Sequence, residues 1–483
     1  MKQPALHIVL FLQLSLCAFS QSGGETPLTL EDAATLMLQN HPELEALRIE
    51  EEVADYGYRA TAGLRLPSLG LTALYAYFPN DIVADLNGLK PQVAGAMGSL
   101  LPALPPSLAE TLIPAITPRI AEMMGKDWKV TLQENSVGIV GSVLTWPVYA
   151  GGKIGVARRS ARLKREVAGA KSQQQTDHLY SQLIERYYGL LLAREVLEVR
   201  KEVLAGMQQH LRDANLLEAN GMIARGEKLY AESVVAEAEK EVTKAQLTVE
   251  SLQRVMQNIL YTPGRWIPVS PLFVLDISDS VPRFLASARK NNAMLKQAGL
   301  QAKLADEGVK LQRAEFLPQV ALTGMARIGD YQLLEGMPGW VAGAGVKLNL
   351  FDGFQRDNHY KAAQARVRQV EALVEQATDN LETGVEKLCF EIRSEERQMP
   401  AIESALLFAG EYLSNKEKLF AEGAATSTDV VDARLHLARL KVDRLQTAYR
   451  FTLLLAGLLE LCGESAQFPE YSRQTGAAPI FVE

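Results

Sequence analysis

Two short stretches of the sequence decide how the whole chain is interpreted: WPVYAGGK at residues 146–153 and LNLFDGFQ at residues 348–355. The first looks like the start of a phosphate-binding loop, because two glycines and Lys153 follow an apolar run. A Walker-type loop also needs an earlier glycine and a Ser or Thr after the lysine, but Ile154 follows here. The second stretch repeats the pattern of the first, and a pattern that occurs twice in a similar context indicates an internal repeat.

The repeat extends over most of the chain. At an offset of 251 residues, residues 40–72 align without a gap with residues 291–323. Further along, the offset is 202 residues, so that Gly151 falls on Gly353. The two offsets differ by 49 residues, which places one insertion in the first half, within about residues 80–128.

The N-terminus has the features of an export signal: Lys2, an apolar run at residues 5–16 and a small-x-small cleavage site at residues 18–20. Lipid modification of Cys17 is the alternative, although Leu16 is not the small residue that lipoprotein signals carry before the cysteine. We therefore expect a signal peptide at 1–20, a first repeat at 21–262, a linker or equatorial segment at 263–281, a second repeat at 282–463 and a C-terminal tail at 464–483.

The composition is that of an ordinary folded protein, with 47% hydrophobic and 22% charged residues, and a net charge of −7 gives no sign of a nucleic-acid partner. No stretch approaches the ~20 apolar residues of a membrane-spanning helix. The most apolar candidate, residues 451–463, is too short. Cys389 and Cys462 lie in helical patterns, so we expect buried free thiols, and a disulfide stays open.

Four segments alternate with period two, as strands with two different environments do: residues 66–78, 135–147, 317–328 and 340–351. Aromatic residues lie near their ends, namely Tyr75, Tyr77, Trp146, Trp340 and Phe351. This placement suits the interfacial girdles of an outer-membrane barrel, but the strands alone equally fit a small soluble antiparallel sheet.

Very long helices are predicted in both halves. No proline occurs from Val148 to Thr262, and residues 153–219 are rich in strong helix formers. At 1.5 Å per residue such a helix would extend roughly 100 Å. A break at Asn220-Gly221 turns the chain back, and the second half repeats this plan over residues 355–461, where Pro400 should kink the first arm. Helices of this length must pack side by side in a coiled assembly.

The number of strands bears on the assembly. Four strands cannot close a barrel, because small barrels need about eight, and lipid does not tolerate an open sheet edge. If these strands cross a membrane, several chains must pool them. Three chains would give twelve strands with a helical cylinder beneath.

In the order of these features the chain resembles the TolC family of outer-membrane efflux proteins. The resemblance covers about residues 27–463. It rests on LTLEDAATLMLQNHPEL at 28–44, the paired Leu-Pro strand entries, the two strand-to-helix junctions quoted above and GAATSTDVVDAR at 423–434.

The resemblance implies a mainly α protein with a membrane β-barrel: a homotrimer with a twelve-stranded barrel, four strands per chain, in the outer membrane of a Gram-negative bacterium. A long α-helical tunnel continues the barrel into the periplasm. Such a protein is a passive exit duct, surrounded by outer-membrane lipid and needing no cofactor or metal. It takes small molecules from an inner-membrane pump, by default of the resistance-nodulation-division type, through a periplasmic adaptor (membrane fusion protein). Type I protein secretion and metal-ion efflux remain alternatives.

The family closes its tunnel at the periplasmic tip with acidic rings, in a pattern of glycine followed by Asp six and nine positions later. Asp429 and Asp432 stand at these places after Gly423, so the resemblance makes them gate residues. The alternative is that they are N-terminal helix acids favoured by the helix dipole. Glu227 occupies the matching place after Gly221 and is expected to help tie hairpins together.

The resemblance also assigns the hairpin tips and the strand-to-helix corners. Adaptor docking is expected at Gly221, Arg225, Gly423 and Thr428, and the corners are expected at Pro67, Gly151, Gly152, Pro318 and Gly353. Where the family often has a tyrosine and a basic residue, this chain has Phe420 and Ala425, so the locking contacts must differ. Arg225 is a candidate substitute.

The insertion at residues 80–128 carries six prolines: Pro91, Pro102, Pro105, Pro106, Pro114 and Pro118. It joins two expected barrel strands and is rich in Leu, Ile, Met and Ala. We expect short helices outside the cell that partly cover the barrel mouth or contact neighbouring chains. An ordinary variable loop is the alternative.

Two other classes of protein come into question. An enzyme is disfavoured, because the six histidines are scattered and neither a nucleophile elbow nor a dinucleotide fingerprint occurs. A periplasmic adaptor is the better rival, but adaptors have one helical hairpin between paired β domains, whereas this chain has two hairpins and four strands.

Overall fold

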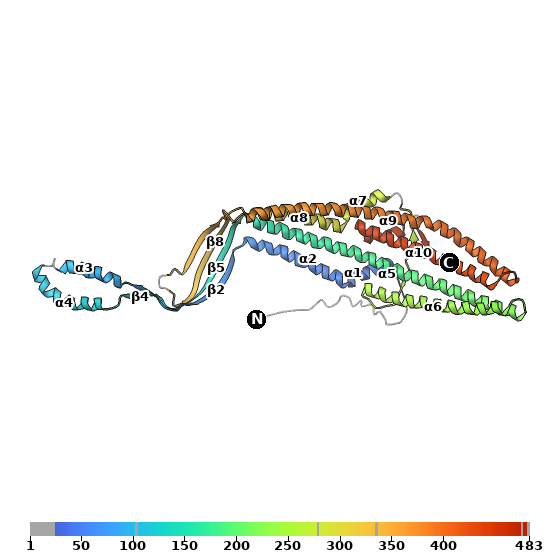
Figure 1. Cartoon of the computed structure of the whole chain (residues 1–483), viewed down its shortest axis with the longest axis horizontal. Helices are drawn as coiled ribbons and strands as arrows, with labels where there is room; N and C mark the ends of the chain where they lie inside the picture. The colour runs from blue at the N-terminus through green and yellow to red at the C-terminus, as the bar shows by residue number, and fades with distance from the viewer. Residues whose placement is uncertain (1–24, 102–104, 278–279, 334–336, 475–476, 481–483) are drawn as a thin grey trace, which may run out of the picture. The chain divides into compact units, whose positions relative to one another are not determined.

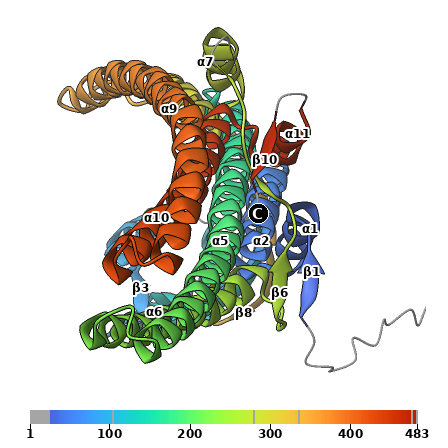
Figure 2. The same ribbon diagram turned by 90° about the vertical axis from the view of Figure 1, so that its right-hand side faces the viewer.

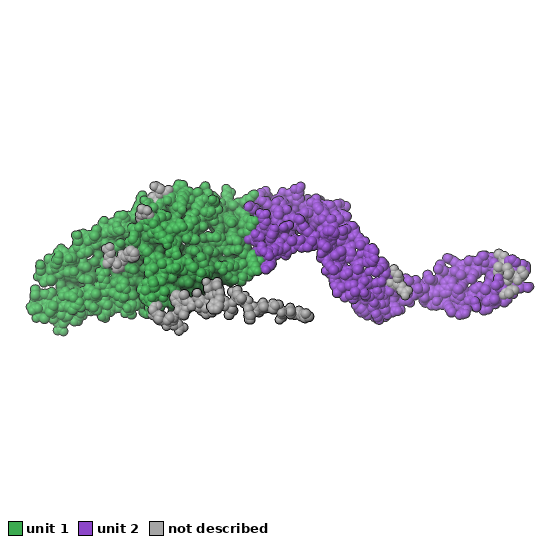
Figure 3. Space-filling view, turned by 180° about the vertical axis from the view of Figure 1, so that it is seen from behind, with its two compact units in different colours: residues 1–53, 166–302, 369–483 green, residues 54–165, 303–368 purple. Residues whose placement is uncertain are grey.

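A computed structural model describes residues 25–101, 105–277, 280–333, 337–474 and 477–480. The expected signal peptide, with Cys17, lies outside these residues. The chain divides into two compact units (Figure 3). Unit 1 comprises residues 1–53, 166–302 and 369–483, and unit 2 comprises residues 54–165 and 303–368. Each unit therefore takes segments from both sequence repeats.

Corresponding helices of the two expected repeats, which are labelled in Figure 1, begin at matching residues. At the offset of 251, α1 (Leu30–Asn40) matches α7 (Val281–Asn291), and the start of α2 (Pro42–Ala60) matches the start of α8 (Ala293–Ala314). At the offset of 202, α5 (Lys153–Ala219) matches α9 (Gln355–Ala421), and α6 (Arg225–Leu260) matches α10 (Ser427–Cys462). Helix α9 continues through Pro400 as one element, so the kink there stays a prediction.

Short strands and the C-terminal segment complete unit 1 (Figure 2). β1 (Thr26–Leu28) pairs in parallel with β6 (Trp266–Pro268), and β7 (Leu272–Val274) pairs antiparallel with β10 (Ala478–Ile480). The tail also forms α11 (Phe468–Ser472), whose Phe468 and Tyr471 are buried in the core.

Tyr187 of α5 connects these short strands to the long helices. Its hydroxyl donates to the carbonyl of Leu28 at 2.7 Å and accepts from the backbone N–H groups of Val269 and Ser270, each at 2.9 Å. The ring is fully buried, so three backbone groups at the end of β1 and after β6 are satisfied by one side chain of a helix.

Unit 2 contains one antiparallel four-stranded sheet in the order β2-β5-β8-β9. Its strands are β2 (Ser68–Tyr77), β5 (Ser136–Ala150), β8 (Gln319–Tyr331) and β9 (Trp340–Lys347). The four predicted strands are confirmed, although β5 runs three residues beyond its expected end at 147 and β9 stops short of 351. Because β2 and β9 each pair on one side only, the sheet has two open edges within one chain.

The insertion is a helical hairpin on a two-stranded ribbon. β3 (Ile82–Asp85) pairs antiparallel with β4 (Lys129–Gln133), and between them lie the 3-10 turn η2 (Asn87–Leu89), α3 (Lys90–Leu100) and α4 (Pro106–Gly125). The helices were expected from the sequence, but the ribbon was not.

Two further expectations concern the described part of the chain. There, no helix combines the length and the apolar character needed to cross a bilayer. Cys389 and Cys462 are both free and buried, which confirms the prediction of free thiols and leaves no disulfide between them.

Candidate functional site at the hairpin tips

The two helical hairpins of unit 1, α5–α6 and α9–α10, turn by the same local mechanism. Gly221 has φ +72° and Gly423 has φ +74°, the left-handed conformation that favours glycine after a helix. In the first turn the N–H of Met222 donates to the carbonyl of Leu217 at 2.8 Å, and in the second Ala424 donates to Leu419 at 2.8 Å. Both tip glycines are exposed, and a Cβ at either would meet open space.

The helices that follow the turns begin differently. Thr426 caps α10 with a reciprocal capping box, in which Asp429 donates its N–H to Thr426 Oγ1 at 3.2 Å. In return, one Asp429 carboxylate oxygen accepts from the N–H of Thr426 at 3.0 Å. Helix α6 has Ala224 at its cap position and no side-chain cap. The carboxylate at the matching position of α6, Glu227, is therefore not used to cap its own helix.

Glu227 instead reaches the other hairpin. Its Oε2 accepts from the backbone N–H of Ser427 at 2.9 Å. Ser427 is the first residue of α10 and is fully buried. An N–H in the first turn of a helix has no intrahelical partner, so Glu227 satisfies a donor that α10 cannot satisfy itself.

The buried side chain of His210 contacts Ser427 as well. His210 Nε2 of α5 is 3.0 Å from Ser427 Oγ, and the His210 ring is tilted against the ring of Phe420, with 4.5 Å between centroids. His210 is 4% exposed. Burial lowers its pKa below the ordinary value of 6.5, although the nearby carboxylates of Asp213 and Glu227 oppose that shift.

Two ion pairs complete this tip cluster, which we define as His210, Glu227, Ser427, Asp429 and Arg434 with their partners. Lys416 Nζ lies 3.0 Å from Asp429 Oδ1, and Arg434 pairs with Glu417. The hydrogen bonds from Thr426, reinforced by Lys416, lower the pKa of Asp429 to about 2. Arg434 also packs on Gly206 of α5, where an added Cβ would overlap the guanidinium.

The predicted gate residues therefore have different surroundings. Asp429 is held within its own chain by the cap and by Lys416. Asp432 is exposed and makes no ion pair or hydrogen bond through its side chain in the described part of the chain. Arg225 and Thr428 are also exposed, and Arg225 forms no ion pair with any described acid, so within one chain it is not the substitute lock.

Sequence reasoning missed most of the tip cluster. Thr426-x-x-Asp429 is a capping-box pattern that a search for helix starts finds. Nothing local marks His210 or Gly206, since only the packing of the two hairpins brings them to Ser427 and Arg434. Lys416 and Arg434 meet Asp429 and Glu417 through the packing of α9 against α10 within one hairpin.

The corner that resembled a phosphate loop is a strand-to-helix junction. Gly151 and Gly152 have φ +62° and +87°, and a Cβ on Gly151 would lie 2.7 Å from the carbonyl oxygen of Ala314. Lys153 pairs with Glu315 at 2.7 Å. The lysine is thus held by a carboxylate at a tight turn and is not free to bind phosphate.

The second corner is similar but not identical. Gly353 has φ +69°, and a Cβ there would meet open space. The position that matches Gly152 is Phe354, which is also left-handed at φ +67°. The two corners therefore share their backbone turn, and close packing excludes a side chain only at Gly151.

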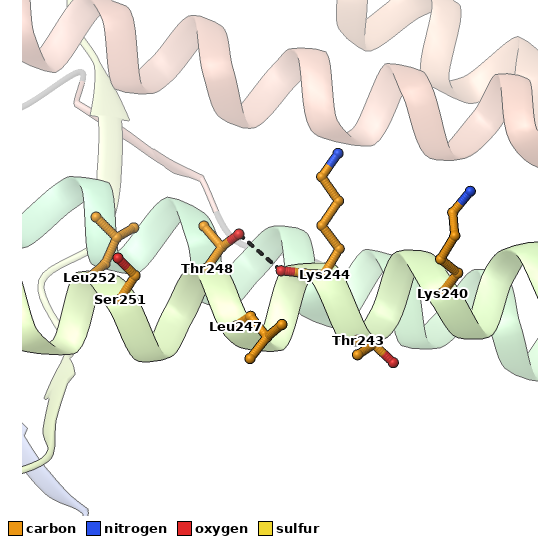
Figure 4. A pocket seen from close by; sticks show the side chains of 7 residues that line it. All are labelled: Lys240, Thr243, Lys244, Leu247, Thr248, Ser251 and Leu252. Carbon is orange, nitrogen blue, oxygen red and sulfur yellow. Dashed lines mark hydrogen bonds between the residues drawn. The ribbon is translucent and has the colours of Figure 1, made fainter.

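The hollow found on these helices is open to solvent. A shallow hollow of about 710 Å³ follows α6, and all seven side chains that line it belong to that helix (Figure 4). With one wall only, it does not enclose a small molecule. No group of His, Cys, Asp and Glu side chains within the described segments has the arrangement of a metal site.

Comparison with known proteins agrees with the fold. Residues 284–464 match the model of the outer membrane efflux protein family. The second half of the chain is thus similar to outer membrane efflux proteins. Solved structures of membrane proteins resemble the chain over most of its length. CusC, whose structures concern transmembrane channel formation, superimposes with a TM-score of 0.70 at 16% identity, covering 90% of this chain and 91% of that chain.

Two further relatives extend the comparison. The outer membrane protein VceC of Vibrio cholerae gives a TM-score of 0.68 at 17% identity over 90% of this chain and 96% of its own. Protein CyaE of Bordetella pertussis is 25% identical over 266 residues, which are 51% of this chain. The match spans about half of that relative, 53% of its length. At such identities the structural matches establish the fold of this chain.

Proposed function

We propose that this outer-membrane protein is the exit duct of a tripartite efflux system, in which three copies form a twelve-stranded barrel continued by a helical tunnel. The duct takes small molecules from an inner-membrane pump of the resistance-nodulation-division type through a periplasmic adaptor. The observation that carries the proposal is the four-stranded sheet with two open edges, β2 and β9. Open edges in lipid leave backbone groups unsatisfied, so β2 of one copy must pair with β9 of the next.

We place the gate at the hairpin tips, with a division of labour between the two aspartates. Asp432 is the exposed, unpaired carboxylate that would face the axis in a trimer and repel anions or bind multivalent cations. Asp429 supports the tip by capping α10 and pairing with Lys416. Glu227 holds the two hairpins of one chain together through Ser427.

The adaptor would dock on the exposed tips formed by Gly221, Arg225, Gly423 and Thr428. Arg225 is a cation without an acidic partner among the described residues, which suits an acidic or carbonyl-lined partner surface. The corners at Pro67, Gly151, Gly152, Pro318 and Gly353 would mark the passage from barrel strand to tunnel helix.

Conductance in a planar bilayer tests the duct and its gate together. The purified protein should give small cation-selective currents that a trivalent cation blocks, and Asp432→Asn should remove the block. Glu239→Gln is the matched control, because Glu239 is an exposed carboxylate on α6 with no side-chain partner among the described residues. Equal block in wild type and Asp432→Asn would remove Asp432 from the gate.

Fractionation of the cell envelope separates the duct from its rivals. A trimer extracted from the outer membrane supports the duct, whereas a protein released with the periplasm or the inner membrane supports an adaptor. Loss of resistance to small toxic compounds or to metal ions, or loss of protein secretion in a deletion strain, then separates drug efflux from the two alternative cargo classes.

A further inference from the structure

We propose that the insertion is an interface between copies of this chain, in which α3 of each copy packs against α3 of its neighbours along a face made by Leu89, Ala96 and Leu100. The inference rests on the proposed trimer. It assigns a partner, a second copy of the same segment, to a hairpin that is otherwise unpartnered.

The hairpin has one apolar seam of its own. Half-buried side chains recur along one face of each helix, namely Val93, Met97 and Leu101 at α3 and Ile113, Ile116, Ile120 and Met124 on α4. Lys90 belongs to the same side of α3, where its ammonium donates to the carbonyl of Lys126 and lies over the Trp128 ring. This seam accounts for one face of α3 only.

The contacts within one chain are too few to hold these helices. No residue of α3 is buried, and none of the described side chains of α4 is buried. An isolated helix of 11 residues, such as α3, is marginal in water, and the 20 residues of α4 include two prolines inside the helix, Pro114 and Pro118. Further apolar burial is therefore needed for the hairpin to be stable.

A second apolar face lies beside the seam on α3. Ala96 and Leu100 of α3 follow Leu89, the last residue of η2, at spacings of seven and four residues. Because the backbone of Leu89 is already in the helical region, this spacing brings the three to one side, as in a coiled-coil seam. Leu89 is 45% exposed and Leu100 is 67% exposed. Such a face needs a partner helix.

Charge and attachment favour an identical helix as that partner. Residues 91–109 contain no charged side chain, so identical copies can approach without like-charge repulsion. The ribbon that carries the hairpin continues from β2 and β5, since the N–H of Phe78 donates to the carbonyl of Asn135 at 2.6 Å at their junction. As β2 is an edge strand, each copy in a closed barrel would bring one hairpin to the same rim.

Cysteine cross-linking in the full-length protein tests this interface. Leu100→Cys and Ala96→Cys, treated with a short bismaleimide in purified trimers, should give covalent dimers and trimers on denaturing gels. Gly98→Cys is the matched control, because position 98 is exposed on the far side of α3 with open space around it. Cross-linking there should be clearly lower than at positions 96 and 100. The parent protein controls for the buried Cys389 and Cys462.

A charge scan gives an independent measurement. Ala96→Glu with Leu100→Glu should lower the temperature at which detergent-purified trimers dissociate, whereas Gly95→Glu with Gly98→Glu adds the same charge to the opposite side and should not. Equal cross-linking at positions 98 and 100, or equal effects of the two charge pairs, would overturn the proposal.

Two other outcomes are distinguishable from these. Protection of the thiol in Leu100→Cys from water-soluble maleimide without any cross-link, in a protein that sizes as a trimer, would place α3 in lipid and reject the interface alone. A protein that sizes as a monomer after mild extraction would reject the trimer and with it the proposed function.

Discussion

The Glu227 carboxylate of the first hairpin accepts a hydrogen bond from the backbone N–H of Ser427, the first residue of the last long helix, at 2.9 Å. The two residues are 200 positions apart in the chain and lie on equivalent helices of the two repeats. One repeat thus satisfies the helix start of the other, and the two equivalent hairpins differ in this contact.

Glu227→Ala is expected to loosen the tip. It leaves the fully buried Ser427 N–H without its acceptor, which costs about 1–3 kcal/mol. Single-channel conductance should rise, and the tip amides should exchange hydrogen faster. Glu239→Ala, on the exposed face of the same helix, is the control, and an identical rise in that variant would argue against a specific tie.

Asp429→Asn is expected to lower stability, and Asp432→Asn is expected to change gating. Asp429 caps α10, and its pKa is lowered to about 2, so its contribution is present above the ordinary value of 3.8 and is lost as pH falls towards 2. Asp429→Asn should therefore lower the melting temperature at neutral pH. Asp432→Asn should leave the melting temperature unchanged and alter cation block. The reverse assignment of the two effects would contradict these roles.

Gly206→Ala tests the contact with Arg434. The added methyl would overlap the guanidinium, which must swing away from Glu417. Gly169→Ala lies on the same helix in open space and should gain up to about 1 kcal/mol from helix propensity. The free energy of unfolding, measured in urea, should be lower for Gly206→Ala than for Gly169→Ala by about 1 kcal/mol or more. Equal stabilities would show that Arg434 relocates without loss.

Gly151→Ala should be the most damaging substitution at the two corners. It combines a positive φ with a contact of 2.7 Å to a backbone oxygen, whereas Gly353→Ala meets only the conformational cost of about 1–2 kcal/mol. The yield of trimer in the outer membrane is the measurement. A yield for Gly151→Ala as high as for Gly353→Ala would mean that Ala314 moves aside easily.

The buried His210 should make the tip less stable in acid. Because its pKa is lowered in the folded protein, the unfolded chain binds the proton more readily, and stability falls as pH drops below about 6.5. Burial raises the pKa of Asp177 to about 6, so this residue has the opposite effect: it makes the folded protein more stable as the pH falls. The melting temperatures of the parent protein and of His210→Gln, which keeps Asp177, should therefore be compared from pH 8 to pH 5. Parallel curves of melting temperature against pH for the two proteins would exclude His210 as the cause of the loss of stability in acid.

Much of the fold was readable because it is periodic. The offsets of 251 and 202 residues placed the paired long helices, and alternation placed the four sheet strands. The ribbon of β3 and β4 was missed, since strands of four and five residues next to a proline-rich segment carry too little alternation to be recognised. The left-handed Phe354 was also unforeseen, because only its glycine counterpart signals such a conformation.

The sequence by itself determined the repeats, the long helices, the strands and the turn glycines, because these depend on hydrogen bonds and burial patterns within short windows. Only the tertiary structure decided which acids are free and which are held. Asp429 and Asp432 look equivalent along the chain, yet one is held by Lys416 and a helix cap and the other is exposed. The contact of Asp429 with Lys416 comes from the packing of α10 against α9 in one hairpin, and the contact of Glu227 with Ser427 comes from the packing of the two hairpins, so neither can be predicted from a short window of sequence.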